Sequence, residues 1–105
     1  MPYKSFSIQE ISEKTKQLFD KYPVKKASIF GSYSRNDMKR GSDVDILIEF
    51  VDLSEPLLFV EIARKLENLL KRKVDLISFS SLDYSDAKSI ILSEAKVIYE
   101  KRHWT

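Results

Sequence analysis

Residues 31–45 read GSYSRNDMKRGSDVD, and this stretch holds both glycines of the 105-residue chain, Gly31 and Gly41. Glycine permits backbone conformations and close approaches that other residues do not, so the two glycines indicate tight backbone geometry here. The largely apolar run 27–30 predicts a buried strand before the segment, and a short helix is expected over 34–38. A strand, a Gly-Ser turn and a helix start present free backbone N–H groups, which favour phosphate. The segment therefore predicts a phosphate site at Gly31 and Ser32.

A pair of carboxylates begins twelve residues after Gly31. Asp43 and Asp45 flank Val44 at the start of the apolar run 46–48. Because side chains alternate along a strand, we expect both carboxylates on one face, about 6.6 Å apart. Mg²⁺ is usually held by one or two carboxylates together with substrate phosphates. The pair therefore predicts a metal-dependent site for a nucleoside triphosphate, although an isolated Asp-x-Asp is also typical of a solvated turn.

A third carboxylate, Asp75, interrupts the apolar run 73–77, which predicts another strand. An unpaired buried carboxylate is costly, so an aspartate in mid-strand needs a partner or a metal ion. If this strand lies beside residues 44–50, Asp75 faces the same pocket, where it would bind metal or take the proton of an incoming hydroxyl. The alternative is an edge strand with Asp75 in water.

Three cations lie between the Gly-Ser turn and the acids. Arg35 is early in the expected short helix, where its guanidinium could bind phosphate oxygens in a bidentate manner. For Lys39 and Arg40, a solvated helix face is at least as good an explanation. The formal net charge of +2 is small and interspersed, so we expect no direct binding of duplex nucleic acid.

The composition predicts one small globular domain over residues 1–105, with 43% hydrophobic and 32% charged residues. No apolar run approaches the roughly 18 residues needed to span a bilayer, and residues 1–21 lack a secretory pattern, so we expect a cytoplasmic protein. The absence of cysteine excludes thiol chemistry, and a single histidine, His103, argues against a histidine-centred triad. Carboxylate and metal chemistry is the main catalytic route left.

Helices and strands are expected to alternate, beginning with a helix, which predicts an α/β fold. Ser7 and Glu10 form a capping box for a helix that continues to about Lys21 and ends before Pro23. Further elements are a helix from 54–56 onward, a helix over 85–93 and a final strand over 96–100. The residues expected to face the core of the three helices are Ile8, Ile11, Thr15, Leu18 and Phe19; Leu58, Ile62, Leu66 and Leu69; and Ala87, Ile90 and Ile91.

The combination of Gly31-Ser32, ten intervening residues, Asp43-Val44-Asp45 and a later strand Asp75 resembles the signature of the DNA polymerase β-like nucleotidyltransferases. The short length is similar to the minimal nucleotidyltransferases, the antitoxin halves of toxin–antitoxin pairs. The resemblance covers about residues 23–99. It implies an α/β (α+β) fold with a small mixed sheet flanked by helices and ATP held by the Gly-Ser segment. It also implies two Mg²⁺ ions bound by the three acids, the third of which is a metal ligand or a general base.

The resemblance also implies a reaction and a partner. AMP would move from ATP to a hydroxyl, with tyrosine as the expected acceptor, on a small helical HEPN-type ribonuclease toxin. Few residues follow the last expected strand, so the acceptor is expected either to bind this small domain directly or to be presented by a separate protein, and the resemblance implies the second. Two alternatives stay open: nucleotidyl transfer to a small hydroxylated molecule such as an aminoglycoside, and a non-catalytic binding module that neutralises its partner by occlusion.

Overall fold

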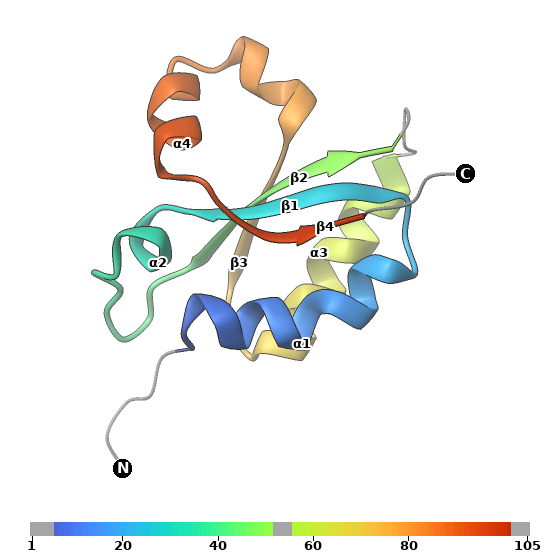
Figure 1. The fold of residues 1–105 in the computed structure, drawn as a ribbon, viewed down its shortest axis with the longest axis horizontal. Helices are drawn as coiled ribbons and strands as arrows, with labels where there is room; N and C mark the ends of the chain where they lie inside the picture. The colour runs from blue at the N-terminus through green and yellow to red at the C-terminus, as the bar shows by residue number, and fades with distance from the viewer. Residues whose placement is uncertain (1–5, 52–55, 102–105) are drawn as a thin grey trace.

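The computed structural model describes residues 6–51 and 56–101, which form a four-stranded mixed sheet flanked by helices (Figure 1). The sheet has the order β3-β2-β1-β4, in which β1 is antiparallel to both β2 and β4, and β2 is parallel to β3. This arrangement confirms the α/β prediction. The elements are α1 (Ile8–Asp20), β1 (Val24–Phe30), α2 (Ser32–Arg35), β2 (Val44–Phe50), α3 (Pro56–Leu70), β3 (Val74–Ser78), the 3₁₀ helix η1 (Phe79–Tyr84), α4 (Lys88–Glu94) and β4 (Lys96–Glu100).

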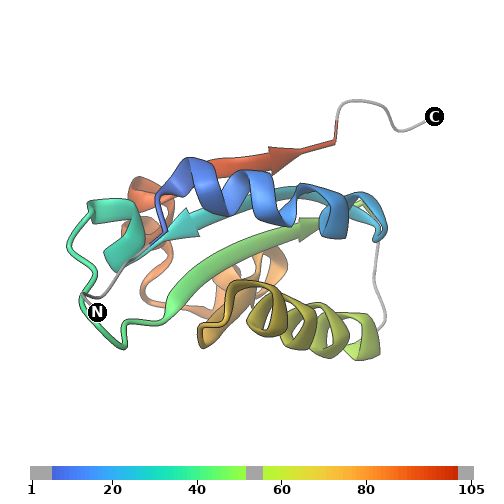
Figure 2. The same ribbon diagram turned by 90° about the horizontal axis from the view of Figure 1, so that it is seen from below.

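The main core lies between one face of the sheet and the helices α1 and α3, which both run along the sheet (Figure 2). Val44, Ile46 and Ile48 of β2 are completely buried in it because alternate residues of a strand share a face. The core residues from α1 and α3 are Ile11, Phe19, Ile62, Leu66 and Leu70.

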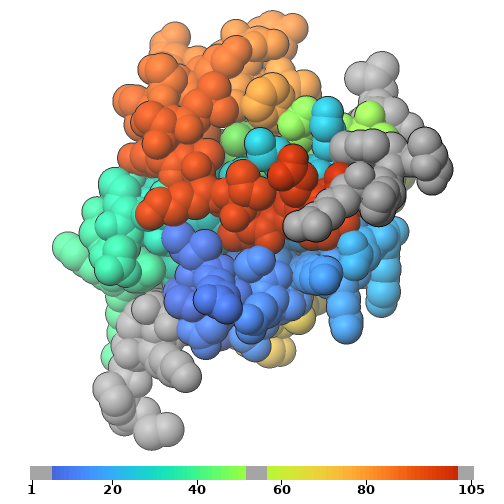
Figure 3. Space-filling model, in the orientation of Figure 1, coloured from blue at the N-terminus to red at the C-terminus, as the bar shows by residue number. Residues whose placement is uncertain are grey.

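The predicted capping box at the start of α1 is confirmed. The Ser7 hydroxyl accepts from the Glu10 backbone N–H at 3.0 Å, and the Glu10 carboxylate accepts from the Ser7 N–H at 2.9 Å. The end of the helix is fastened to β4, because the Tyr99 hydroxyl donates to Asp20 at 2.7 Å. Burial, followed by this contact with Asp20, raises the pKa of Tyr99 to about 12. In the space-filling view α1 and β4 lie side by side (Figure 3).

The opposite face of the sheet has a smaller cover, made by η1 and α4. A second apolar cluster forms there from Phe30, Leu47, Leu82 and Ile91. The turn of 3₁₀ helix was not expected from the sequence, and it delays the start of the last helix from residue 85 to Lys88. Ile90, expected to face the core, is 60% exposed, because α4 turns Ile91 and not Ile90 toward the sheet.

Two further expectations need correction. Leu69 is 39% exposed and Leu70 takes its place in the core, four residues after Leu66. The short helix occupies Ser32–Arg35 instead of 34–38, because Asn36 adopts a left-handed conformation with φ of 60° that ends it. The expected helix start at Ser54 and Glu55, and His103, lie outside the described residues.

The last helix and β4 follow the expected chain order, and β4 has the predicted bounds. None of the helices in the described ranges combines the length and apolar character that crossing a bilayer requires.

Candidate functional site

The site is built around Gly31, where β1 ends. Gly31 has a φ of +74°, a conformation that residues with a side chain rarely adopt. A Cβ added here would lie 2.0 Å from the Oδ2 atom of Asp45. The glycine therefore lets the Asp45 carboxylate pack directly against the backbone of the Gly-Ser turn.

The helix α2 follows as a single turn and is anchored to the end of α4. The Arg35 N–H donates to the Gly31 carbonyl at 3.0 Å, which closes the turn. The Ser34 hydroxyl donates to the Glu94 carbonyl, and Lys96 Nζ donates to the Ser34 carbonyl at 2.8 Å. These contacts fix the position of the turn relative to the junction of α4 and β4.

The two carboxylates of the Asp-x-Asp pair lie where β2 begins, and both are half-buried. Burial, followed by the negative charges of Asp75 and Asp43, raises the pKa of Asp45 to about 6, against a smaller lowering by Arg35. Ionised Asp45 is thus held among other carboxylates in a partly desolvated position. Such a concentration of negative charge favours a bound cation.

Asp75 is paired in register with Asp45 across the parallel strands β2 and β3. However, β3 is an edge strand and Asp75 is exposed, as the edge-strand alternative describes. Across the described parts of the chain, no group of three or more His, Cys, Asp or Glu side chains is placed to hold a metal ion. The charges of Asp43 and Asp75 both act on Asp45, and Asp75 is its neighbour across the strands. The role of Asp75 as metal ligand or base stays a prediction.

An open depression of about 580 Å³ lies over these residues. Its volume is within the range of roughly 300–1,000 Å³ that is usual for ligand pockets. It brings together five of the six residues expected from the sequence: Gly31, Ser32, Arg35, Asp43 and Asp45. The remaining lining residues are Phe30, Gly41, Ser42, Ala87, Ile91 and Glu94.

Glu94 is a site residue that the sequence analysis missed. Its Oε1 atom accepts from the Gly31 backbone N–H at 3.1 Å, and its Oε2 atom accepts from Arg35 Nη1 at 2.8 Å. The bonds to Glu94 and then Asp37 raise the pKa of Arg35. Glu94 is the last residue of α4, 63 residues from Gly31, so no local pattern marks it.

Sequence comparison with known proteins identifies a family and several relatives of this chain. The family model described as polymerase beta, nucleotidyltransferase matches residues 13–103. A Methanocaldococcus jannaschii protein that is provisionally named a protein adenylyltransferase is 42% identical over 89 residues, which cover 85% of this chain and 95% of that protein. The protein adenylyltransferase MntA of Thermococcus cleftensis is 41% identical over 76 residues, covering 72% of this chain and 77% of that protein.

Solved structures show the same fold at lower identity. One chain in a complex of the tri-AMPylated HEPN toxin of Shewanella oneidensis with its MNT antitoxin aligns with a TM-score of 0.65 at 24% identity. The alignment covers 90% of this chain and 73% of that chain. The fold, the depression and the family match over residues 13–103 lead to one conclusion: the chain belongs to the polymerase β-type nucleotidyltransferase family.

Proposed function

We propose that this chain transfers AMP from ATP to a hydroxyl of a HEPN-type toxin, with tyrosine as the acceptor, and thereby acts as its antitoxin. The observation that carries the proposal is the packing of the Asp45 carboxylate against the backbone of Gly31. This packing supports the proposal because the expected phosphate turn then lies next to one of the expected metal ligands. The protein acceptor is supported by the relatives' names as protein adenylyltransferases and by the toxin complex of the Shewanella protein.

In this reaction the acceptor oxygen attacks the α-phosphorus of ATP, the bond from that phosphorus to the bridging oxygen breaks, and pyrophosphate leaves. The Gly31-Ser32 turn and Arg35 would hold the phosphates, since backbone N–H groups and a guanidinium both match phosphate oxygens. The acceptor's proton would pass to Asp75 or to water, provided that the substrate brings the hydroxyl within hydrogen-bonding reach.

Asp43 and Asp45 fit a divalent ion because both are half-buried carboxylates, and because Asp45 is surrounded by the negative charges of Asp75 and Asp43. We propose Mg²⁺, with two ions as the full complement and Asp75 as the third ligand. Bound metal would neutralise charge on the phosphate and on the leaving pyrophosphate. The substrate's own phosphates would supply ligands that the protein lacks.

The test is intact-mass spectrometry of the HEPN-type protein encoded beside this chain after incubation with this chain, ATP and Mg²⁺. Mass increments of whole AMP units are expected with the wild-type chain. The double variant Asp43→Asn/Asp45→Asn should lose at least about 10²–10³-fold in rate, because it removes the charges that position the reacting groups. A control, Asp86→Asn/Glu100→Gln, removes two exposed carboxylates outside the depression and should retain the activity.

Two outcomes would contradict the proposal. If no AMP is added but the two proteins form a stable complex, the chain is a binding module that acts by occlusion. If the toxin stays unmodified while AMP appears on an aminoglycoside or another small alcohol, the acceptor has been wrongly assigned.

A further inference from the structure

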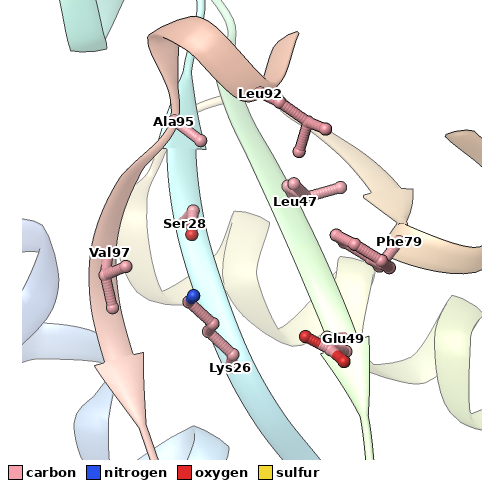
Figure 4. A pocket seen from close by; sticks show the side chains of 8 residues that line it. All are labelled: Lys26, Ser28, Leu47, Glu49, Phe79, Leu92, Ala95 and Val97. Carbon is pink, nitrogen blue, oxygen red and sulfur yellow. The ribbon is translucent and has the colours of Figure 1, made fainter. Parts of the chain in front are cut away.

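A second hollow lies on the same face of the sheet as Asp45, on the other side of the small cluster under α4. We call it the sheet-face groove; it is bounded by β4, β1, β2 and the side chains of Phe79 and Leu92 (Figure 4). Its volume is about 190 Å³, below the roughly 300 Å³ at which pockets for small molecules begin. It is sized for a single large side chain.

The groove has apolar walls that are exposed to solvent. Phe79 is 41% exposed, Leu92 40% and Val97 50%, and they come from η1, α4 and β4. In Figure 4, Leu92 lies above Leu47 and Phe79 below it to the right, with Val97 on the opposite side. Large apolar side chains that gather around one hollow are typical of a protein interaction site.

The floor of the groove carries polar groups with unused hydrogen-bonding capacity. Ser28 is only 4% exposed, and among the described residues its hydroxyl has no hydrogen-bond partner. Lys26 is half-buried, and within the same described ranges its ammonium has no hydrogen bond or ion pair. Glu49 faces Lys26 in register, but its ion pair is with Lys25 at 3.8 Å. A partly desolvated, unpaired ammonium favours a carboxylate from outside.

The position of the groove on β2 indicates which molecule would use it. Leu47, in the groove, and Asp45, in the candidate active site, are two residues apart and share a face, so about 6.6 Å of strand separates them. A protein anchored in the groove therefore has its neighbouring surface over the depression. A molecule whose hydroxyl must reach a phosphate held beside Asp45 gains most from such an anchor, because positioning supplies much of the catalysis in phosphoryl-type transfer.

We propose that the sheet-face groove docks the acceptor protein by taking one apolar or aromatic side chain between Phe79 and Leu92, while a neighbouring carboxylate pairs with Lys26. The proposal rests on the proposed function, because it assumes that the acceptor is a protein. It assigns the groove to acceptor binding and leaves ATP to the depression around Gly31.

The test compares two substitutions on α4 in the full chain. Leu92→Glu places a charge in the wall of the groove, whereas Ile90→Glu places one on the same helix outside the groove, at a residue that is 60% exposed. The probe is the purified HEPN-type protein used above. Its Kd is measured by calorimetry, its KM and kcat by intact-mass spectrometry, and the Kd of a fluorescent ATP analogue by titration.

With Leu92→Glu, we expect Kd and KM for the acceptor to rise at least tenfold. ATP affinity should change less than twofold, and the thermal melting curve should match that of the wild type. Ile90→Glu should leave all of these values within twofold. Val97→Glu provides a second wall variant on β4 should Leu92→Glu unfold the chain. Lys26→Met should raise Kd by about threefold and weaken its dependence on salt, because it removes one charge pair.

Each contrary result has a distinct meaning. If wall variants bind and modify the acceptor like the wild type, the groove proposal fails and the proposed function stands. If they lose ATP affinity, the groove belongs to the nucleotide and the proposal is wrong. If light scattering shows that they convert a wild-type dimer to a monomer without affecting the acceptor, the occupant is a second copy. If the wild-type chain neither binds nor modifies the acceptor, both proposals fall.

Discussion

The two faces of the sheet use alternate residues of the same strands for different purposes. On β2, Val44, Ile46 and Ile48 are completely buried under α1 and α3, whereas Asp45 and Leu47 face η1 and α4. The covered face is a continuous apolar layer, and the open face combines a small apolar cluster with carboxylates and two hollows. Because side chains alternate in direction, one strand can stabilise the fold and carry the chemistry without either set of residues constraining the other.

The largest expected effect is a difference between the two faces in how much a substitution lowers the free energy of unfolding. Ile46→Ala removes a completely buried side chain from the main core and should lower the free energy of unfolding by about 2–5 kcal/mol. Leu47→Ala, in the smaller cluster on the open face, should cost less because neighbouring side chains there can relax into the groove. Urea unfolding measures both. An equal or larger loss for Leu47→Ala would mean that the open face contributes to stability as much as the covered one.

The two glycines allow a sharper test, confined to the open face. Gly31 and Gly41 both have positive φ, but an added Cβ would overlap Asp45 at Gly31 and meets no atom within 4 Å at Gly41. Gly31→Ala should therefore displace the Asp45 carboxylate and lower the rate of AMP transfer by about 10²-fold, as expected for misplaced catalytic groups. Gly41→Ala should cost about 1–2 kcal/mol of stability through backbone strain, with a much smaller loss of rate.

Mass spectrometry gives the rates, and urea unfolding gives the stabilities of the same two variants. The comparison would fail if Gly41→Ala lowered the rate as much as Gly31→Ala at equal folded fraction, since backbone strain alone would then explain both.

The covered face was easier to predict from sequence than the open face. Its alternating residues on β2 and the capping box of α1 are local patterns, which depend on neighbours within a few positions. The error at Leu69 arose because a stripe of leucines does not show which of two adjacent residues meets the sheet. Contacts with a neighbouring element decide that choice, and they are not visible in a local pattern.

On the open face, sequence spacing found Gly31, Asp43 and Asp45 because they lie within fifteen residues of one another. It missed Glu94, which approaches Gly31 from 63 residues away through the path of η1 and α4. The side-chain alternation also left the burial of Asp75 undecided, because burial depends on whether β3 is an edge strand. Both gaps concern tertiary contacts that no local pattern encodes.

A smaller effect concerns the charge of Asp45. Its pKa is raised from 3.8 to about 6 in the folded protein, so its protonated form favours folding. The stability it contributes is complete below about pH 4 and is lost as the pH rises through 6. In EDTA at pH 7.5, Asp45→Asn should therefore be more stable than the wild type and unfold at a higher urea concentration. The expected gain in the free energy of unfolding is about 1 kcal/mol after allowance for solvent screening.

The difference between Asp45→Asn and the wild type should shrink toward pH 4.5, and Asp86→Asn, which removes an exposed carboxylate, should show no such trend. If Asp45→Asn is no more stable than the wild type at pH 7.5, the carboxylate is not destabilised by its neighbours. The argument that its surroundings favour a cation would then lose its basis.

The smallest expected effect concerns Glu94, whose carboxylate accepts hydrogen bonds from two groups that we assign to phosphate, the Gly31 N–H and Arg35. An incoming triphosphate must replace that carboxylate and also meets its negative charge. Glu94→Gln keeps an acceptor oxygen but removes the charge, so ATP should bind more tightly by up to about fivefold, the size of a partly exposed charge interaction. Asp37 is the other partner of Arg35 and lies outside the depression, so Asp37→Asn should change ATP affinity less. Titration with a fluorescent ATP analogue decides: weaker binding by Glu94→Gln would show that Glu94 holds the turn in its binding conformation and does not compete with phosphate.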